Sequence, residues 1–373
     1  MNSKIKNYLL SGIFLLIIAF FTASYFIKGT SDFSDAERRA LKQFPDLSVK
    51  TLENGKFMTE FETFSLDQFP MRDTMRSVKS VFERFVFANK ESNDLYYYKG
   101  HIASLLYPLD KTMLDYALER FNGLYDRYAK QGDAKVYFSM IPDKSAYLAE
   151  KAGVLSVDYK EFIDYMIAGM PQDIEYIDIS SLLSADDFYY TDQHWRQESI
   201  ADVANALSEA LGNPLSDEYT KVTLETPFYG TYYHQAAIPG VSPDSISYLT
   251  NDTIEGCKVS LLDGYGKMTE SEMYVLSYAE GRDPYEMYLS GAQPLITIEN
   301  PNADTDKQLV VFRDSFGSSI MPLLAESYAK ITLCDIRYIA PADLANYVDF
   351  ENCDDMLFLY STLIVDAATA LRK

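Results

Sequence analysis

The sequence predicts an α/β protein with a mostly parallel β-sheet covered by helices on both faces, preceded by one N-terminal transmembrane helix. From about Lys111 onward, short apolar runs alternate with amphipathic helical segments, which is the pattern of parallel strands joined by crossover helices. Ahead of this region, the run from Tyr8 to Ile27 contains no charged residue. A helix of that length reaches about 30 Å, the thickness of the hydrocarbon core of a bilayer.

The residues around the apolar run indicate the side of the membrane on which the chain lies. Lys4 and Lys6 precede the run, which favours a cytoplasmic amino end and an extracytoplasmic body. We therefore expect residues 1–29 to form a cytoplasmic stub and a single-pass anchor in the cell membrane. The alternative is a signal peptide cleaved near the small residues TAS (22–24), which would release a secreted protein. Both interpretations place the main body outside the cytoplasm.

Composition limits the partners and cofactors. The chain has 33 basic against 55 acidic side chains and a net charge of −22, which disfavours binding to nucleic acid phosphates. Its three cysteines and three histidines lack the spacing of a metal site, so we expect neither a metal nor an organic cofactor. A disulfide between Cys334 and Cys353 is one interpretation of the cysteines, and three buried thiols are the other.

Beyond the anchor, residues 30–373 are expected to form a single extracytoplasmic domain. Within it, residues 30–110 form a leading region, and residues 220–301, rich in Tyr, Gly and Pro, form an insertion. The leading region predicts a helix over SDAERRALKQFP, with Ser34 as its N-cap. It also predicts a β-hairpin in LYYYKGHIASLLY, with Lys99 and Gly100 at the turn.

The alternating elements of the α/β region follow from hydrophobic periodicity and from stop signals such as Gly132 and Gly212. Helices are expected over residues 113–132, 158–170, 198–212 and 319–330. Strands are expected over residues 135–141, 174–179, 308–312, 331–336 and 356–361.

The candidate nucleophile follows the strand QLVVF. The segment RDSFG (313–317) leads directly into a helical segment, so Ser315 is expected at the carboxyl end of a sheet strand, where α/β proteins bind ligands. The backbone N–H groups of Ser315, Phe316 and Gly317 are expected to stabilise an oxyanion near the helix start. The alternative is that Ser315 or Ser318 only caps the helix.

The candidate base lies in YYTDQHWRQES (189–199). Asp192 and His194 are two residues apart just before a helix, and a carboxylate beside an imidazole can hold its tautomer and stabilise its charged form. The spacing therefore predicts a base with its orienting acid. The alternative is a capping Asp192 and a His194 whose ring bonds to the backbone. No metal ligands are predicted.

Four further residues are expected to line the pocket. Trp195, the only tryptophan, follows the candidate base directly, and Arg313 precedes the nucleophile segment. Tyr233 and His234 lie in the aromatic segment FYGTYYHQA. Because His234 has no carboxylate nearby in the sequence, we expect it to have a structural or substrate-lining role and assign the base to His194.

These motifs resemble a known family. RDSFG followed by PLLAESY resembles the nucleophile block of SGNH hydrolases, and more closely that of the bacterial DHHW proteins. TDQHW resembles the motif that names the DHHW family and the D-x-H-W of alginate O-acetyltransferase-like proteins. The segments ERRALKQFP, DQFPMRD and DIRYI agree in order. The resemblance covers nearly the whole chain beyond the membrane segment, and it implies an SGNH-hydrolase-like fold.

Two positions depart from the family patterns. Gln193 stands where the DHHW motif has its first histidine, and Arg313 stands where a GDS block has glycine. The first departure removes any role of that histidine, although the alginate-type relatives also vary there. The second leaves the oxyanion hole undefined.

The resemblance implies a Ser-His-Asp acyltransferase that forms an acyl-enzyme on Ser315. The resemblance further implies that the reaction is O-acetylation and that the acceptor is an extracellular polysaccharide or cell-wall glycan. A membrane-bound O-acyltransferase would be the partner that supplies acetyl groups. Two alternatives remain: a carbohydrate esterase with the same triad, and a non-catalytic module that binds glycans or organises a synthesis complex.

Overall fold

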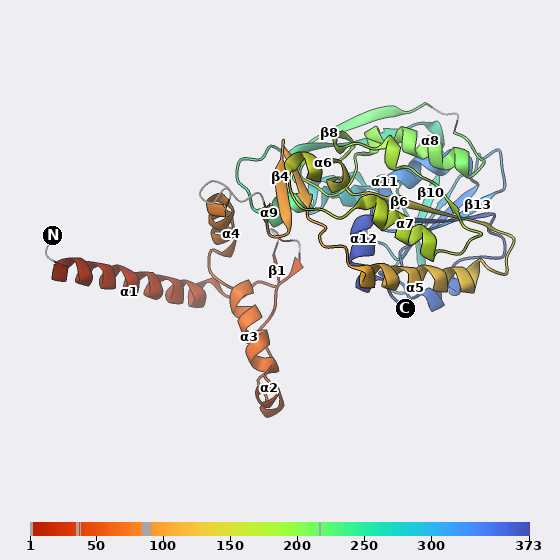
Figure 1. Cartoon of the computed structure of the whole chain (residues 1–373). Helices are drawn as coiled ribbons and strands as arrows, with labels where there is room; N and C mark the ends of the chain where they lie inside the picture. Colours follow the sequence, from red (N-terminus) through yellow and green to blue (C-terminus); the bar gives the residue numbers. More distant parts are fainter. Residues whose placement is uncertain (1–2, 35–36, 38, 84–90, 216–217) are drawn as a thin grey trace. The chain divides into compact units, whose positions relative to one another are not determined.

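The computed structural model describes residues 3–34, 37, 39–83, 91–215 and 218–373. The chain divides into two compact units. The first comprises residues 1–92 and 234–240, and the second comprises residues 93–233 and 241–373 (Figure 1). The predicted boundaries at residues 29, 110, 220 and 301 stay predictions.

The first unit contains one long helix and several short elements. Helix α1 (Ser3–Lys28) is long and apolar enough to cross a membrane, as an anchor or as a signal sequence. The other elements are β1 (Phe33–Ser34), β2 (Arg39–Ala40), α2 (Val49–Glu53), α3 (Lys56–Asp67), α4 (Arg72–Val81) and β3 (Glu91–Ser92).

The helix predicted from Ser34 to Pro45 is wrong. Strands β1 and β2 pair antiparallel in its place, and residues 35–36 and 38 of the predicted helix lie outside the described residues. Arg39 donates hydrogen bonds to both carboxylate oxygens of Asp67, and Glu37 forms an ion pair with Arg72. These charged partners lie on other elements, so contacts distant in sequence override the local helix propensity.

The second unit is built on an eight-stranded sheet in the order β11-β10-β12-β14-β13-β15-β6-β7. The five strands from β14 to β7 are parallel, and the three at the other edge are antiparallel. The predicted mostly parallel sheet is therefore confirmed. The strands are β6 (Lys135–Ile141), β7 (Glu175–Tyr176), β10 (Lys258–Leu262), β11 (Met268–Ser271), β12 (Leu295–Glu299), β13 (Gln308–Arg313), β14 (Lys330–Cys334) and β15 (Asp355–Ser361).

Alternating residues of the central strands divide the core between the two faces of the sheet, as the pleat requires. Val311 and Leu357 pack on one face, and Val310 and Phe358 pack on the other. Helix α8 (Ala201–Ala210) covers the first face together with the 3-10 helix η7 (Met321–Ser327). Helices α5 (Lys111–Tyr128), α7 (Tyr159–Gly169) and α12 (Thr362–Asp366) cover the second (Figure 1).

The remaining elements surround this core. Strands β4 (Leu95–Tyr98) and β5 (His101–Ser104) pair antiparallel around Lys99 and Gly100, which confirms the predicted hairpin. Within residues 220–301, β8 (Thr220–Phe228) and β9 (Asp244–Thr250) form a separate antiparallel ribbon, whereas β10–β12 extend the main sheet. The short helices are α6 (Ser145–Ala152), α9 (Thr231–Ala236), α10 (Asp252–Gly256) and α11 (Gly317–Ile320).

The three cysteines are free thiols, and Cys334 and Cys353 are buried. The structure therefore does not contain the disulfide left open by the sequence. Cys334 ends β14 inside the core beneath α5 and α7, where it packs as a small apolar residue.

The carboxyl ends of three parallel strands meet at one edge of the sheet. Arg313 of β13 is in register with Leu359 of β15, and Ser361 of β15 is in register with Ile141 of β6. The loops that follow these strands therefore emerge side by side. After β13, the predicted helix is only the one-turn α11, which continues as η7 because Pro322 has no backbone N–H to donate.

Replacement of Phe358 by alanine should lower the free energy of unfolding by about 3–5 kcal/mol, because the ring is fully buried in the core. Its centroid lies 4.9 Å from that of Phe312 and 5.8 Å from that of Phe121. Denaturant unfolding of the full chain measures the loss. Tyr265, which is 97% exposed, is the control, and Tyr265→Ala should change stability by less than about 0.5 kcal/mol. Equal losses for the two variants would contradict this core.

Candidate active site

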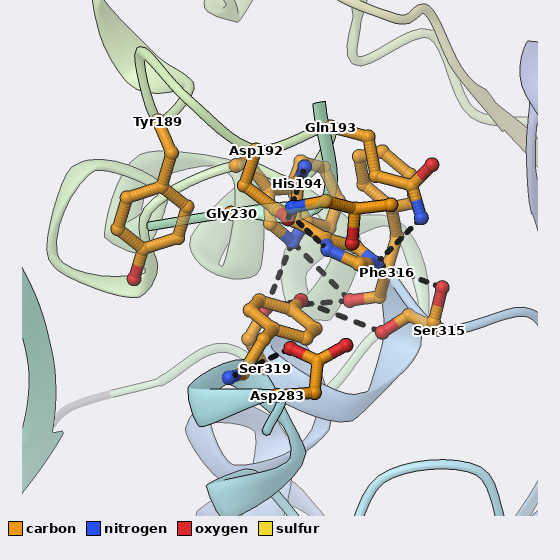
Figure 2. A network of polar contacts seen from close by, with 12 residues as sticks. Tyr189, Asp192, Gln193, His194, Gly230, Asp283, Ser315, Phe316 and Ser319 are labelled. Carbon is orange, nitrogen blue, oxygen red and sulfur yellow. Dashed lines mark hydrogen bonds and ion pairs between the residues drawn. The ribbon is translucent and has the colours of Figure 1, made fainter. Parts of the chain in front are cut away.

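Ser315, His194 and Asp192 form a continuous chain of hydrogen-bonding contacts (Figure 2). The Oγ of Ser315 lies 2.8 Å from Nε2 of His194, and Nδ1 of His194 lies 2.6 Å from Oδ1 of Asp192. Asp192 and His194 are buried, and Ser315 is half-buried. The fold thus brings together two segments that are 121 residues apart in sequence.

The acceptor chemistry of Asp192 assigns the protons along this chain. An ionised carboxylate can only accept hydrogen bonds, so Nδ1 of His194 donates to Asp192. In the neutral imidazole, Nε2 is then the acceptor for the hydroxyl of Ser315. This arrangement can deprotonate a serine and return the proton to a leaving group.

The carboxylate of Asp192 is held by two further backbone donors. The N–H of His194 donates to Oδ1 at 3.0 Å, and the N–H of Thr231 donates to Oδ2 at 2.7 Å. Burial by itself would raise the pKa of Asp192, but the charge and hydrogen bond of His194, together with these N–H groups, hold it well below its ordinary value. The carboxylate is therefore ionised at neutral pH.

The contact between Thr231 and Asp192 depends on the absence of a side chain at Gly230. A Cβ at residue 230 would lie 2.2 Å from Cβ of Asp192 and 2.6 Å from its backbone nitrogen. The N–H of Gly230 also donates to Oγ1 of Thr191 at 3.0 Å. Glycine is therefore required for the close approach of these two loops.

The side chain of Lys144 forms hydrogen bonds with the backbone of the same loop. Its buried ammonium group donates to the carbonyls of Asp192 at 2.6 Å, Tyr189 at 2.8 Å and Tyr190 at 3.4 Å. Lys144 follows the carboxyl end of β6, so the sheet edge positions it. Desolvation lowers its pKa to about 7, against the opposing pull of Asp192, Asp244 and Asp143.

Asp314 organises the backbone on either side of the nucleophile. Its Oδ1 accepts from the N–H of Phe316 at 3.0 Å, and its Oδ2 accepts from the N–H of Ser361 at 2.9 Å. The N–H of Gly317 donates to the carbonyl of Asp314 at 3.1 Å. Two of the three predicted oxyanion donors are thus already engaged in fixing the turn, which differs from the expected role of Phe316 and Gly317.

An aromatic and hydroxyl cluster joins the two halves of the site. The ring of Tyr285 stacks on His194 with centroids 3.7 Å apart and an interplanar angle of 5°. Its hydroxyl lies 2.8 Å from Oγ of Ser319, which also accepts from the indole N–H of Trp195 at 2.8 Å. Because Ser319 lies on α11, this cluster ties the base segment to the turn that carries Ser315 (Figure 2).

Trp195 and Arg313 are fully buried, so they differ from their predicted pocket-lining positions. The indole of Trp195 packs under the site, and the guanidinium of Arg313 lies 3.5 Å from the carboxylate of Asp335. Both side chains therefore lie in the core of the second unit. Tyr233 is half-buried and donates its N–H to Thr191 at 2.9 Å. His234 belongs to the first unit, and its pocket-lining role stays a prediction.

Among the described residues, no group of three or more His, Cys, Asp or Glu side chains could hold a metal ion. The sequence analysis did not identify Lys144, Gly230 or Tyr285. A lysine directly after an apolar strand was the available signal for Lys144. Gly230 and Tyr285 contact the site only through tertiary folding, and no local pattern marks either residue.

Replacement of Gly230 by alanine should destabilise the protein by about 1–3 kcal/mol, because the new methyl group overpacks the Asp192 loop. Chemical denaturation measures the effect. Gly123 is the control: it lies inside α5, where a Cβ would meet nothing within 4 Å. Gly123→Ala should stabilise the protein by about 0.5–1 kcal/mol. An unchanged free energy of unfolding for Gly230→Ala would contradict this expectation, because the two loops could then separate without loss of stability.

Lys144→Met should alter how stability depends on pH. Between its folded pKa of about 7 and its ordinary value of 10.5, Lys144 is neutral in the folded chain and protonated in the unfolded chain. The unfolded state then binds more protons, so the stability of the native protein relative to Lys144→Met should rise across this window. Below about pH 7 the difference should be constant. Denaturant titrations at a series of pH values measure it, and a difference that stays flat up to pH 10.5 would contradict the lowered pKa.

A scan against protein-family models matches no family, and a search of the curated proteins finds no match. Among solved structures, a DHHW family protein from Eubacterium siraeum is 22% identical over 76% of this chain and 97% of its own, with a TM-score of 0.61. PatB1 from Bacillus cereus, in a structure with a sulfonyl adduct, is 18% identical over 75% of this chain and 98% of its own, with a TM-score of 0.60.

The likeness to the O-acetyltransferase domain of Pseudomonas putida AlgJ is weaker, at 12% identity over 73% of this chain and 92% of its own, with a TM-score of 0.46. At such identities, similarity to the first two structures establishes a common fold. The expected structural neighbours are therefore found, and the chain shares its α/β fold with a DHHW family protein and PatB1.

Proposed function

We propose that this protein is an extracytoplasmic serine O-acyltransferase that modifies hydroxyl groups of a glycan through an acyl-enzyme on Ser315. The observation that carries the proposal is the chain of contacts from Ser315 through His194 to Asp192, with distances of 2.8 and 2.6 Å. A serine that merely capped a helix would not need a buried, carboxylate-oriented imidazole at its hydroxyl.

In the first half-reaction, Oγ of Ser315 attacks the carbonyl carbon of the acyl donor while Nε2 of His194 takes the hydroxyl proton. The tetrahedral intermediate collapses, the leaving group receives that proton, and an ester forms on Ser315. In the second half-reaction, His194 takes the proton of an acceptor hydroxyl, whose oxygen attacks the ester. Collapse transfers the acyl group and returns the proton to Oγ of Ser315.

Two groups favour the charged states along this path. The ionised carboxylate of Asp192 stabilises the imidazolium that forms on His194. The electron-rich face of Tyr285, stacked on the same ring, also favours the cation. For the oxyanion we assign the backbone N–H of Ser315, which donates no hydrogen bond within the described part of the chain, together with the side-chain amide of Gln193. That amide lies 3.4 Å from Nε2 of His194.

The glycan acceptor and the acetyl-supplying membrane partner come from the family resemblance of the two sequence motifs. An extracytoplasmic location fits both, because α1 can anchor the chain beside such a supplier. Hydrolysis uses the same catalytic groups with water as the acceptor. The choice between transfer and hydrolysis therefore depends on the acceptor site rather than on the triad.

The first test uses a sulfonyl fluoride, because sulfonyl electrophiles react with activated serines and PatB1 was solved with a sulfonyl adduct. The full chain in detergent should gain one adduct on Ser315, as located by peptide mass spectrometry. Ser315→Ala should abolish labelling and reduce turnover of a chromogenic acetyl ester by at least about 10³-fold. Ser318→Ala, a buried serine three residues along the turn, should retain both. Equal labelling of the Ser315→Ala variant would remove the nucleophile assignment.

The same ester, offered with and without an oligosaccharide, separates the two reactions. Transfer predicts acetylated sugar as the main product and a rate that rises with acceptor concentration. Free acetate at a rate independent of the sugar would identify an esterase. No turnover, with Ser315 unlabelled, would leave only a non-catalytic module.

A further inference from the structure

Helix α4 exposes an apolar stripe. Met75 and Val78 are three residues apart and lie on one side of the helix. Met71 and Phe82 flank the helix at its two caps and extend this stripe. In chain order, the four side chains are 46%, 39%, 45% and 51% exposed. In a water-soluble protein, a stripe with this period faces the core.

The polar side of α4 is the side that packs within the first unit. The guanidinium of Arg72 donates to the carboxylate of Glu37 at 3.0 Å, and Arg76 lies 3.6 Å from the same carboxylate. Arg76 also donates to the carbonyl of Gln235 at 2.7 Å, and Ser80 donates to that of Ala236 at 2.7 Å. The helix therefore packs Arg76 and Ser80 against the rest of the unit and exposes Met75 and Val78, the reverse of the usual arrangement.

The apolar stripe is continuous with the candidate membrane span. Met71 and Met75 join α1 in lining an apolar cleft of about 400 Å³. The ring of Phe21 on α1 stacks on Phe69, just before α4, with centroids 5.2 Å apart. The α1 residues of the cleft are Ile13, Leu16, Ile17, Phe20 and Phe21, all within the charge-free run.

We propose that α4 is a membrane-contacting helix that packs against α1, with its stripe of Met71, Met75, Val78 and Phe82 facing lipid acyl chains. A helix with this reversed arrangement is stable only if its apolar side leaves water, and the medium that surrounds α1 supplies that environment. On the polar side, Arg72 and Arg76 keep their ion pairs with Glu37 within the protein, so these charges stay away from the lipid. The occupant is lipid rather than protein because the stripe adjoins a span whose own side chains are exposed.

This arrangement has a consequence for orientation. A single transmembrane helix leaves the attached unit free to rotate about the membrane normal and to tilt. A second helix that contacts lipid and packs against the first removes much of that freedom. The inference depends on α1 remaining attached, and it is independent of the chemistry proposed for Ser315.

The test compares two faces of the same helix in the full-length protein. Val78→Trp places a fluorophore on the stripe, and Lys79→Trp places one at the next position, where the lysine side chain is 56% exposed. Each variant is reconstituted into phosphatidylcholine nanodiscs, and Trp195, which is fully buried, gives a constant background. Brominated phosphatidylcholine reports contact with acyl chains, and acrylamide reports contact with water.

For a helix whose stripe contacts acyl chains, brominated lipid should quench the added tryptophan of Val78→Trp at least about twofold more than that of Lys79→Trp. Acrylamide should show the reverse order. Acrylamide quenching of Val78→Trp that equals that of Lys79→Trp, without lipid quenching, would overturn the proposal, because the stripe would then face water. Protection of Val78→Trp from both quenchers would also overturn it, because a second copy or another protein would then cover the stripe.

Discussion

The geometry of the candidate site depends on the hydrogen bonds that the buried carboxylate of Asp192 accepts. A charge removed from water is stable only where hydrogen bonds and opposite charge replace its hydration. The imidazole and N–H of His194 and the N–H of Thr231 supply that replacement. To deliver the N–H of Thr231, the loop must pass so close that residue 230 can only be glycine.

The buried polar groups around Asp192 also need hydrogen-bond partners. The loop that carries Asp192 turns its carbonyls inward, and the ammonium group of Lys144 satisfies three of them. On the opposite loop, the carboxylate of Asp314 accepts hydrogen bonds from the N–H groups of Phe316 and Ser361. Ser319 then links the two loops through Trp195 and Tyr285. The position of Ser315 against His194 therefore results from many satisfied buried polar groups rather than from one contact.

The two units differ in where their apolar and polar side chains lie. In the second unit, apolar residues fill both faces of the sheet, and buried charged groups such as Asp192 and Asp314 accept hydrogen bonds from backbone N–H groups. In the first unit, α4 keeps its ion pairs inside and its apolar stripe outside. Such opposite partitioning within one chain is expected if part of it lies in lipid, where water no longer drives apolar groups together. The proposed lipid contact would account for the exposed stripe.

The sequence by itself determined the class of fold and the identities of the candidate nucleophile, base and acid. Strand β6 has the predicted bounds of residues 135–141, and Asp192 and His194 pair across two residues as their spacing indicated. Hydrophobic periodicity and short-range spacing are local properties, so they can be read directly from the chain. The tertiary structure alone decided the replacement of the predicted helix at Ser34 by paired strands, the burial of Arg313, and the roles of Lys144 and Gly230 beneath Asp192. Each of these depends on partners far away in sequence and on the free energy of burying charge, which no local pattern encodes.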